Sequence, residues 1–196
     1  TPYTQLNYYT GGGKGKNETF IDVWHTQNIT PFWNAGFRYN LISSDGRYMN
    51  QKSKAYNFSV FSSYEKERWM INFFLNQNNG HFNENGGVSD KKFIRDTTLN
   101  AENVPVNLSN VKNKYRNFNF YTLLQYNIGK RKETVRGEDT LQSYPAKALF
   151  SATIEDNTHR FKENSVNFDF FPFTWTAPPI LIFKAITSTI SLPNWS

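Results

Sequence analysis

The sequence predicts an all-β fold made of antiparallel strands, and three observations support this prediction. Segments in which apolar and polar residues alternate recur along the 196 residues, and a period of two is typical of strands with one apolar and one polar face. Aromatic residues make up 17% of the chain, and strands favour aromatic side chains. Helical periodicity is almost absent, so the sequence indicates a sheet with little helix.

Nine segments carry the strand pattern, and many approach the length of about nine to eleven residues that crosses a bilayer obliquely. They lie at about 1–9, 18–29, 33–43, 56–64, 68–77, 116–128, 146–155, 164–171 and 180–192. Bacterial barrels made from one chain normally have an even number of strands. We therefore expect a barrel, or a partial barrel, of about eight to ten strands.

The segment NFNFYTLLQYNIG (117–129) shows the alternation clearly. We predict that one face holds Phe118, Phe120, Leu124, Tyr126 and Ile128, and that the other holds Asn117, Asn119, Gln125 and Asn127. Tyr121 and Leu123 fall on the polar side and do not fit this division. An apolar face meets either a protein core or lipid, so the pattern alone leaves a soluble sheet and a transmembrane barrel open.

The connections between the segments alternate in length. Tight turns are expected at 30–32 and 65–67, whereas 10–17 and 44–55 are longer loops and 78–115 is a very long polar segment. Outer-membrane barrels have short turns on one side of the membrane and long loops on the other. Residues 129–145 depart from this order, because a short turn is expected there.

The distribution of charge favours the transmembrane barrel. Segments 1–9, 33–43, 56–64, 69–77 and 117–128 together contain one charged residue, Arg38. A soluble sheet usually covers its wet face with Lys and Glu, whereas here neutral Asn, Ser, Thr and Gln form the polar faces. The sequence therefore favours an up-and-down transmembrane β-barrel, as one domain over 1–196, rather than a soluble all-β domain.

Aromatic residues flank both tight turns. Phe32 and Trp33 adjoin the first, and Tyr64 and Trp69 adjoin the second. Membrane barrels carry girdles of aromatic residues at the headgroup level, and we predict that these four belong to one. Cross-strand packing of aromatics in an ordinary sheet is the alternative.

The composition excludes several function classes. The absence of cysteine excludes disulfides and thiolate metal sites. The net charge is +6, but Lys and Arg lie in short clusters, so we expect no nucleic-acid binding. The histidines lack metal-ligand spacing, and GGGKGK (11–16) lacks the spacing of a phosphate-binding loop. We therefore expect no enzyme activity, no metal and no cofactor.

A series of motifs resembles the porin-like proteins of Bacteroidetes outer membranes. The motifs are TPYT (1–4), HTQNI (25–29), PFWNAGFRY (31–39), GRYMNQ (46–51), ENGG (84–87), VPVNLSN (104–110) and YNIGK (126–130). The similarity is good over 1–130, looser to 171 and poor at 172–179. The resemblance implies an outer-membrane barrel of a Gram-negative Bacteroidetes cell. Family members are considerably longer, so we expect the chain to be a fragment of a longer barrel.

The polar faces supply the predicted lining of a lumen. The candidates are Asp22, Asn34, Arg38, Asn40, Asn72, Asn76, Asn117, Asn119, Gln125 and Asn127. Asp22 and Arg38 are expected on adjacent strands about one pair step apart. Opposed charges in a lumen tune ion selectivity, although simple mutual neutralisation is an equally good explanation.

The long polar segment 78–115 contains the candidate constriction. We hypothesise that this loop folds partly into the lumen, where Glu84, Asn85, Gly86 and Gly87 narrow it. Two adjacent glycines allow backbone conformations closed to other residues, and Glu84 adds a charge. A tight turn in a surface loop is the alternative.

The expected function is passive diffusion of small hydrophilic solutes across the outer membrane, with membrane lipid as the surrounding partner. A barrel that conducts little and anchors other outer-membrane or surface proteins is the second hypothesis. A soluble all-β carbohydrate-binding domain is the third. Conductance in planar bilayers distinguishes the channel from the anchoring barrel. Extraction distinguishes the third hypothesis, because a barrel needs detergent and a soluble domain does not.

Overall fold

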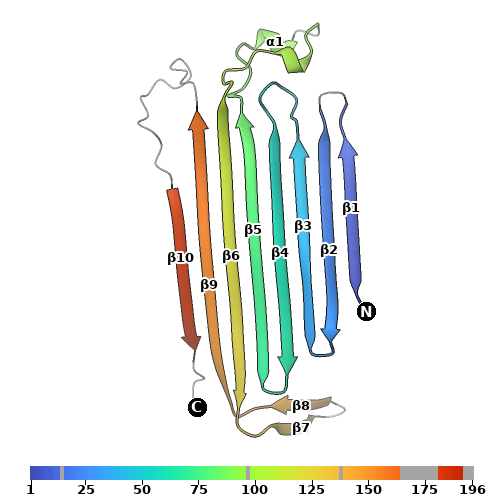
Figure 1. Cartoon of the computed structure of the whole chain (residues 1–196), viewed down its shortest axis with the longest axis vertical. Coiled ribbons are helices and arrows are strands. Elements are labelled where there is room, and N and C mark those ends of the chain that lie inside the picture. The colour runs from blue at the N-terminus through green and yellow to red at the C-terminus, as the bar shows by residue number, and fades with distance from the viewer. Residues whose placement is uncertain (14–15, 96–97, 137–138, 164–180, 192–196) are drawn as a thin grey trace.

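The computed structural model describes residues 1–13, 16–95, 98–136, 139–163 and 181–191. Eight strands form one sheet in the order β1-β2-β3-β4-β5-β6-β9-β10, as Figure 1 shows. Their bounds are β1 Tyr3–Gly11, β2 Glu18–Thr30, β3 Trp33–Ser44, β4 Ser53–Lys66, β5 Trp69–Glu84, β6 Val111–Ile128, β9 Ala146–Glu163 and β10 Leu181–Ser191. A separate hairpin consists of β7 Lys132–Arg136 and β8 Asp139–Ser143, and the long loop holds α1 Lys92–Arg95 and the 3-10 turn Ala101–Asn103.

The sheet is antiparallel throughout and runs up and down. Each strand pairs with the next one along the chain, except that the β7–β8 hairpin is inserted between β6 and β9. The outer edges of β1 and β10 do not pair with each other in the part of the chain that the structure describes. The prediction of an all-β, up-and-down fold is confirmed, and the open sheet is a partial barrel.

Several strands are longer than predicted. The predicted loop 78–115 is wrong at both ends, because β5 continues to Glu84, β6 begins at Val111, and the loop spans only 85–110. These strand ends pair in full register, from Asn78 opposite Asn117 to Glu84 opposite Val111. On the apolar face the polar residues Asn79, His81 and Asn83 follow Leu75 and Gln77, so the alternation of 69–77 does not continue and cannot reveal the strand.

The remaining predictions concern the C-terminal third of the chain. Residues 129–145, for which a short turn was expected, contain the β7–β8 hairpin. The predicted strand at 164–171 lies outside the described residues, whereas the segment predicted at 180–192 corresponds to β10.

The register divides the side chains between a polar face and an apolar face. Directly opposed residues of neighbouring strands share a face, so Arg38 and its partner Ser59 define the polar face. Phe37 and its partner Val60 define the apolar face. The register places all five predicted apolar residues of 117–129 on the apolar face, opposite partners such as Trp69 and Leu75.

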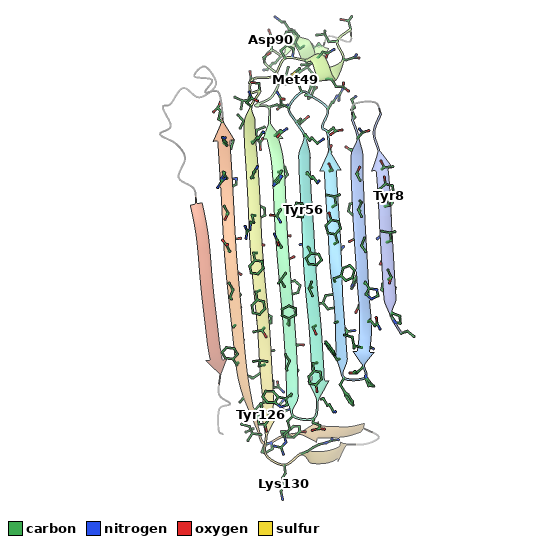
Figure 2. All side chains as sticks on the ribbon, in the orientation of Figure 1. Tyr8, Met49, Tyr56, Asp90, Tyr126 and Lys130 are labelled. Carbon is green, nitrogen blue, oxygen red and sulfur yellow. The ribbon has the colours of Figure 1, made fainter. Side chains whose placement is uncertain are left out.

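The sheet is a single layer, so few side chains are buried. Among the described residues, the buried apolar side chains are Val104, Leu108 and Val111, where the long loop meets the start of β6. Large side chains of the strands remain exposed, including Trp69 at 49% and Leu6 at 67%. Figure 2 shows these side chains along the strands of the one sheet. Exposure of so much apolar surface to water is unfavourable.

We predict that Gly36 is required for close packing on the polar face. A Cβ atom at Gly36 would lie 2.5 Å from Cζ of Phe61 and 2.5 Å from the carbonyl oxygen of His25. Gly36→Ala should therefore lower the free energy of unfolding by about 1–3 kcal/mol, as overpacking does elsewhere. Gly11→Ala is the matched control, because a Cβ there meets nothing within 4 Å. Urea unfolding in detergent measures both, and equal stability of the two variants would contradict the prediction.

Candidate functional site

A row of side-chain amides crosses the polar face at one level. Seven directly opposed residues on seven neighbouring strands form this amide row, six of them Asn and one Asp. In strand order they are Asn7, Asp22, Asn40, Asn57, Asn78, Asn117 and Asn157. The row brings together residues that are far apart in the sequence, which only the pairing register can do.

Hydrogen bonds connect most of the amide row. Asn78 Nδ2 donates to Asn117 Oδ1 at 2.9 Å, and Asn117 Nδ2 donates to Asn157 Oδ1. Asn57 Nδ2 donates to Asn78 Oδ1, and Asn7 Nδ2 donates to Asp22 Oδ2 at 3.5 Å. Asn amides both donate and accept, so the six Asn residues supply neutral polar groups to the row, whereas Asp22 supplies a carboxylate.

An ion pair connects Asp22 of the amide row to Arg38 in the next row of the polar face. Arg38 Nε donates to Asp22 Oδ1 at 2.8 Å, and its Nη2 donates to Oδ2 at 3.2 Å. Asp22 lies opposite Asn40, whereas Arg38 lies opposite Trp24, so the two charges are one pair step apart. The carboxylate is 12% exposed and the Arg38 side chain is 50% exposed. The bidentate geometry orients the guanidinium along the face.

The structure places the ten predicted lumen-lining residues on the polar face. Each of the ten residues, which lie on strands β2 to β6, is paired with residues of the polar face on the neighbouring strands. Sequence reasoning missed Asn7, Asn57, Asn78 and Asn157, although they share the face. Asn7 and Asn57 lie in segments where alternation was visible, whereas Asn78 and Asn157 lie beyond the predicted strand ends.

A row of aromatic residues accounts for one of the two misfits of the sequence pattern. Tyr121 lies opposite Phe74, and Phe74 lies opposite Phe61, all on the polar face. Leu123 lies between Asn72 and Ser151, and nothing in the structure explains its position. The polar face is therefore not uniformly polar, because its half nearer the short turns carries this aromatic row.

The four aromatic residues predicted to form a girdle gather near the short turns. Trp33 lies directly opposite Tyr64, and Trp33 Nε1 donates to Ser62 Oγ at 2.8 Å. Trp69 packs on Tyr126 with ring centroids 4.7 Å apart. Phe32 lies in the turn beneath the Lys66 ammonium, which is 5.3 Å from its ring centroid. Their position in a membrane interface stays a prediction.

The ENGG motif (84–87) lies where the long loop leaves β5, and we call this segment the neck of the loop. Gly86 and Gly87 have φ values of 63° and 83°, a region that favours glycine. The neck pairs with the VPVNLSN segment, since Leu108 N donates to Asn85 O at 2.9 Å and Asn107 N donates to Gly87 O at 3.0 Å. Glu84 Oε1 accepts a hydrogen bond from Asn113 Nδ2.

The long loop lies beyond the ends of β5 and β6 in Figure 1. The sheet formed by the described strands is open, so these strands enclose no lumen that the loop could enter. The hypothesis that Glu84, Asn85, Gly86 and Gly87 narrow a lumen therefore stays a prediction.

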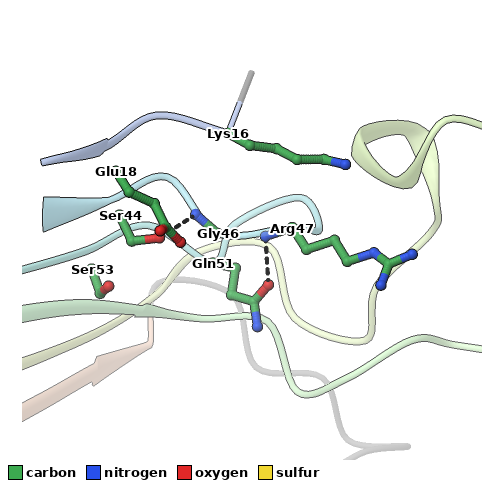
Figure 3. Close-up of a pocket in the computed structure, with 7 residues that line it drawn as sticks. All are labelled: Lys16, Glu18, Ser44, Gly46, Arg47, Gln51 and Ser53. Carbon is green, nitrogen blue, oxygen red and sulfur yellow. Dashed lines mark hydrogen bonds between the residues drawn. The ribbon is translucent and has the colours of Figure 1, made fainter. Parts of the chain in front are cut away.

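Two loops at the same end enclose a shallow polar hollow of about 440 Å³. Its lining is Lys16, Glu18, Ser44, Gly46, Arg47, Gln51 and Ser53, drawn in Figure 3. Ser44 Oγ accepts from Gly46 N, and Gln51 Oε1 accepts from Arg47 N. The hydrogen bond from nearby Lys52 lowers the pKa of Asp45. These bonds hold charged side chains at the rim of the sheet.

The described residues contain no cluster of three or more His, Asp or Glu that could hold a metal ion. Among the same residues, no helix has the length and apolar character needed to cross a membrane.

The open, antiparallel, up-and-down sheet with one polar and one apolar face places the protein in the class of partial β-barrels. The family described as "Putative porin" matches residues 1–179, and the chain belongs to this family. The chain matches no curated protein and no solved structure.

Proposed function

We propose that the protein forms part of an outer-membrane channel through which small hydrophilic solutes diffuse passively in a Gram-negative bacterium. The amide row carries this proposal, because its six Asn residues present neutral donors and acceptors on the face opposite the apolar one, beside the single carboxylate of Asp22. A lumen lined by amides exchanges hydrogen bonds with water and solutes without binding them tightly. Membership of the porin family supports the same function, and no catalysed chemistry is proposed.

The height of the apolar face supports insertion in a membrane. Apolar side chains extend along this face from Trp33 to Leu41 on β3 and, with Ser62 as the exception, from Tyr64 to Tyr56 on β4. The roughly eight residue steps between these ends correspond to roughly 27 Å along a strand, and a tilt of about 40° reduces this to roughly 21 Å, close to the apolar band of about 25 Å in known barrels. We call this region the apolar band, and Tyr56 marks its end nearer the long loops in Figure 2.

A closed lumen requires partners for both free edges of the sheet. β1 and β10 each leave one edge without a neighbour in the described part of the chain, and unpaired backbone groups are costly in lipid. We propose that further strands pair with these edges and complete the barrel.

Reconstitution in planar bilayers tests the proposed channel. The protein purified in detergent should produce stepwise conductance, and vesicles that contain it should swell in solutions of small sugars. Heat-denatured protein is the control. A folded, membrane-inserted protein that produces neither conductance steps nor swelling would overturn the proposal.

A barrel that anchors partner proteins is the second candidate function. The aromatic row of Phe61, Phe74 and Tyr121 favours it, because the exposed rings of Phe74 and Tyr121 on the polar face offer contact area to a protein segment. Absence of conductance in the bilayer experiment, together with insertion in the membrane, is the result that this function predicts.

A further inference from the structure

Basic side chains gather on the apolar face immediately beyond the apolar band, on the side of the long loops. We call this region the basic collar, and it consists of Lys54, Lys112, Lys114, Arg116, Arg160 and Lys162. The band ends on β6 at Phe118, and Arg116, Lys114 and Lys112 follow at successive positions on the same face. On β6 the collar therefore begins at Arg116, level with Tyr56, the last band residue of β4, whereas on β4 it begins one side-chain position further on, at Lys54.

The pairing register sets like charges against each other in the collar. Lys112 lies directly opposite Lys162, and Lys114 lies directly opposite Arg160. Like charges at opposed positions destabilise a sheet. Among the described residues, the ion pairs do not include any collar residue, and these four side chains are exposed. No ion pair among the described residues therefore supplies these four cations with a counter-charge.

The surrounding groups add little negative charge. His81 lies between Lys54 and Lys114 in one row. The nearest acid on this face along β9 is Asp156, opposite Phe118 and therefore inside the apolar band. Glu84 and Glu163 both lie opposite Val111, on the other face. The collar is consequently a local excess of positive charge on this side of the sheet.

A buried amide without a hydrogen-bond partner lies at the lower border of the collar. Asn79 lies directly opposite Arg116 and Tyr56 on the apolar face. Its side chain is 8% exposed, and its Nδ2 makes no hydrogen bond among the described residues. A buried donor without an acceptor is costly, so this donor and the cations beside it together indicate an anionic ligand.

We infer that the basic collar binds phosphate groups of membrane lipid headgroups in the leaflet on the side of the long loops. This inference rests on the proposed membrane insertion, which places the collar at headgroup height just above the apolar band. Basic side chains next to a membrane surface attract anionic headgroups, and Lys and Arg both bind phosphate strongly. The headgroups supply the counter-charge for the opposed cations and an acceptor for Asn79.

Lipid binding by native mass spectrometry in nonionic detergent tests the inference. The probes are lipid A with its phosphate groups and the same lipid after their removal. The wild-type protein should prefer the phosphorylated lipid. K114Q/R160Q should weaken that binding about 25-fold, because each basic residue near an anionic surface contributes about fivefold. K130Q/K147Q removes the same charge at the short-turn end and should change binding less than about twofold.

Three outcomes would overturn the inference. The first is equal binding of the phosphorylated and the dephosphorylated lipid, and the second is an equal loss of lipid binding in K114Q/R160Q and in the control K130Q/K147Q. The third is displacement of the lipid by inorganic phosphate, which would indicate a site for free anions. The unfolding midpoint checks that K114Q/R160Q folds, and relief of the opposed charges should leave it unchanged or raised. Conductance is measured in a separate experiment. Selective lipid binding by a protein that does not conduct would refute the proposed channel function but support the proposed binding of lipid phosphate by the basic collar.

Discussion

Replacing Arg38 by Gln is expected to shift the channel towards cations, and replacing Asp22 by Asn is expected to shift it towards anions. In the native protein the two charges neutralise each other through hydrogen bonds of 2.8 and 3.2 Å. Either substitution leaves one charge without its partner on the polar face. A unit charge about 7 Å from a permeating ion in water contributes roughly 0.6 kcal/mol, which is about threefold in a permeability ratio.

Reversal potentials in a salt gradient measure the two shifts. The matched control is the ion pair between Lys52 and Asp45, whose N···O distance is 2.9 Å and which lies outside the strands. Lys52→Gln and Asp45→Asn change charge in the same way and should shift selectivity less. Opposite shifts for Arg38→Gln and Asp22→Asn would assign the pair to the permeation path. Unchanged reversal potentials would show that the pair serves only to neutralise charge.

Asn117→Leu is expected to cause a large loss of stability. Asn117 is 8% exposed and connects the amide row, because it accepts from Asn78 and Asn119 and donates to Asn157. Leu has a similar volume but satisfies none of these groups, and each buried group without a partner costs about 1–3 kcal/mol. We expect the free energy of unfolding to fall by about 2–3 kcal/mol.

Gln125→Leu is the control for Asn117→Leu. Gln125 is on the same strand and the same face, but its side chain donates one hydrogen bond, to Asn127 Oδ1 at 2.9 Å. Equilibrium unfolding by urea in detergent micelles measures both variants. Equal losses in the two variants would show that the amide row contributes no more than an ordinary pair of polar neighbours.

The faces of the strands could be predicted from single segments. Successive side chains alternate between the two sides of a strand, so the pattern around Phe118 and Asn119 divides those residues without knowledge of the neighbouring strand. The same reasoning assigned Asp22 and Arg38 to one face. It failed beyond Gln77, where Asn79, His81 and Asn83 replace the apolar residues of the pattern and the end of the alternation resembled the start of a loop.

The amide row and the basic collar could not be predicted in this way. Asn57 and Asn157 lie at one level only because each intervening strand pairs in one particular register. The collar needs β6 and β9 to be neighbours, although the β7–β8 hairpin separates them in the sequence. A local pattern contains no information about either relation.

The sequence by itself therefore determined that the protein is an up-and-down sheet, which side chains share a face, and which family it resembles. These properties follow from the two-residue period of a strand and from short motifs, both of which are local. The tertiary structure decided the length of the strands, the alignment of Asn residues across seven of them, and the opposition of Lys114 to Arg160. Register is the physical reason, because it depends on turn geometry and on how two distant segments pair.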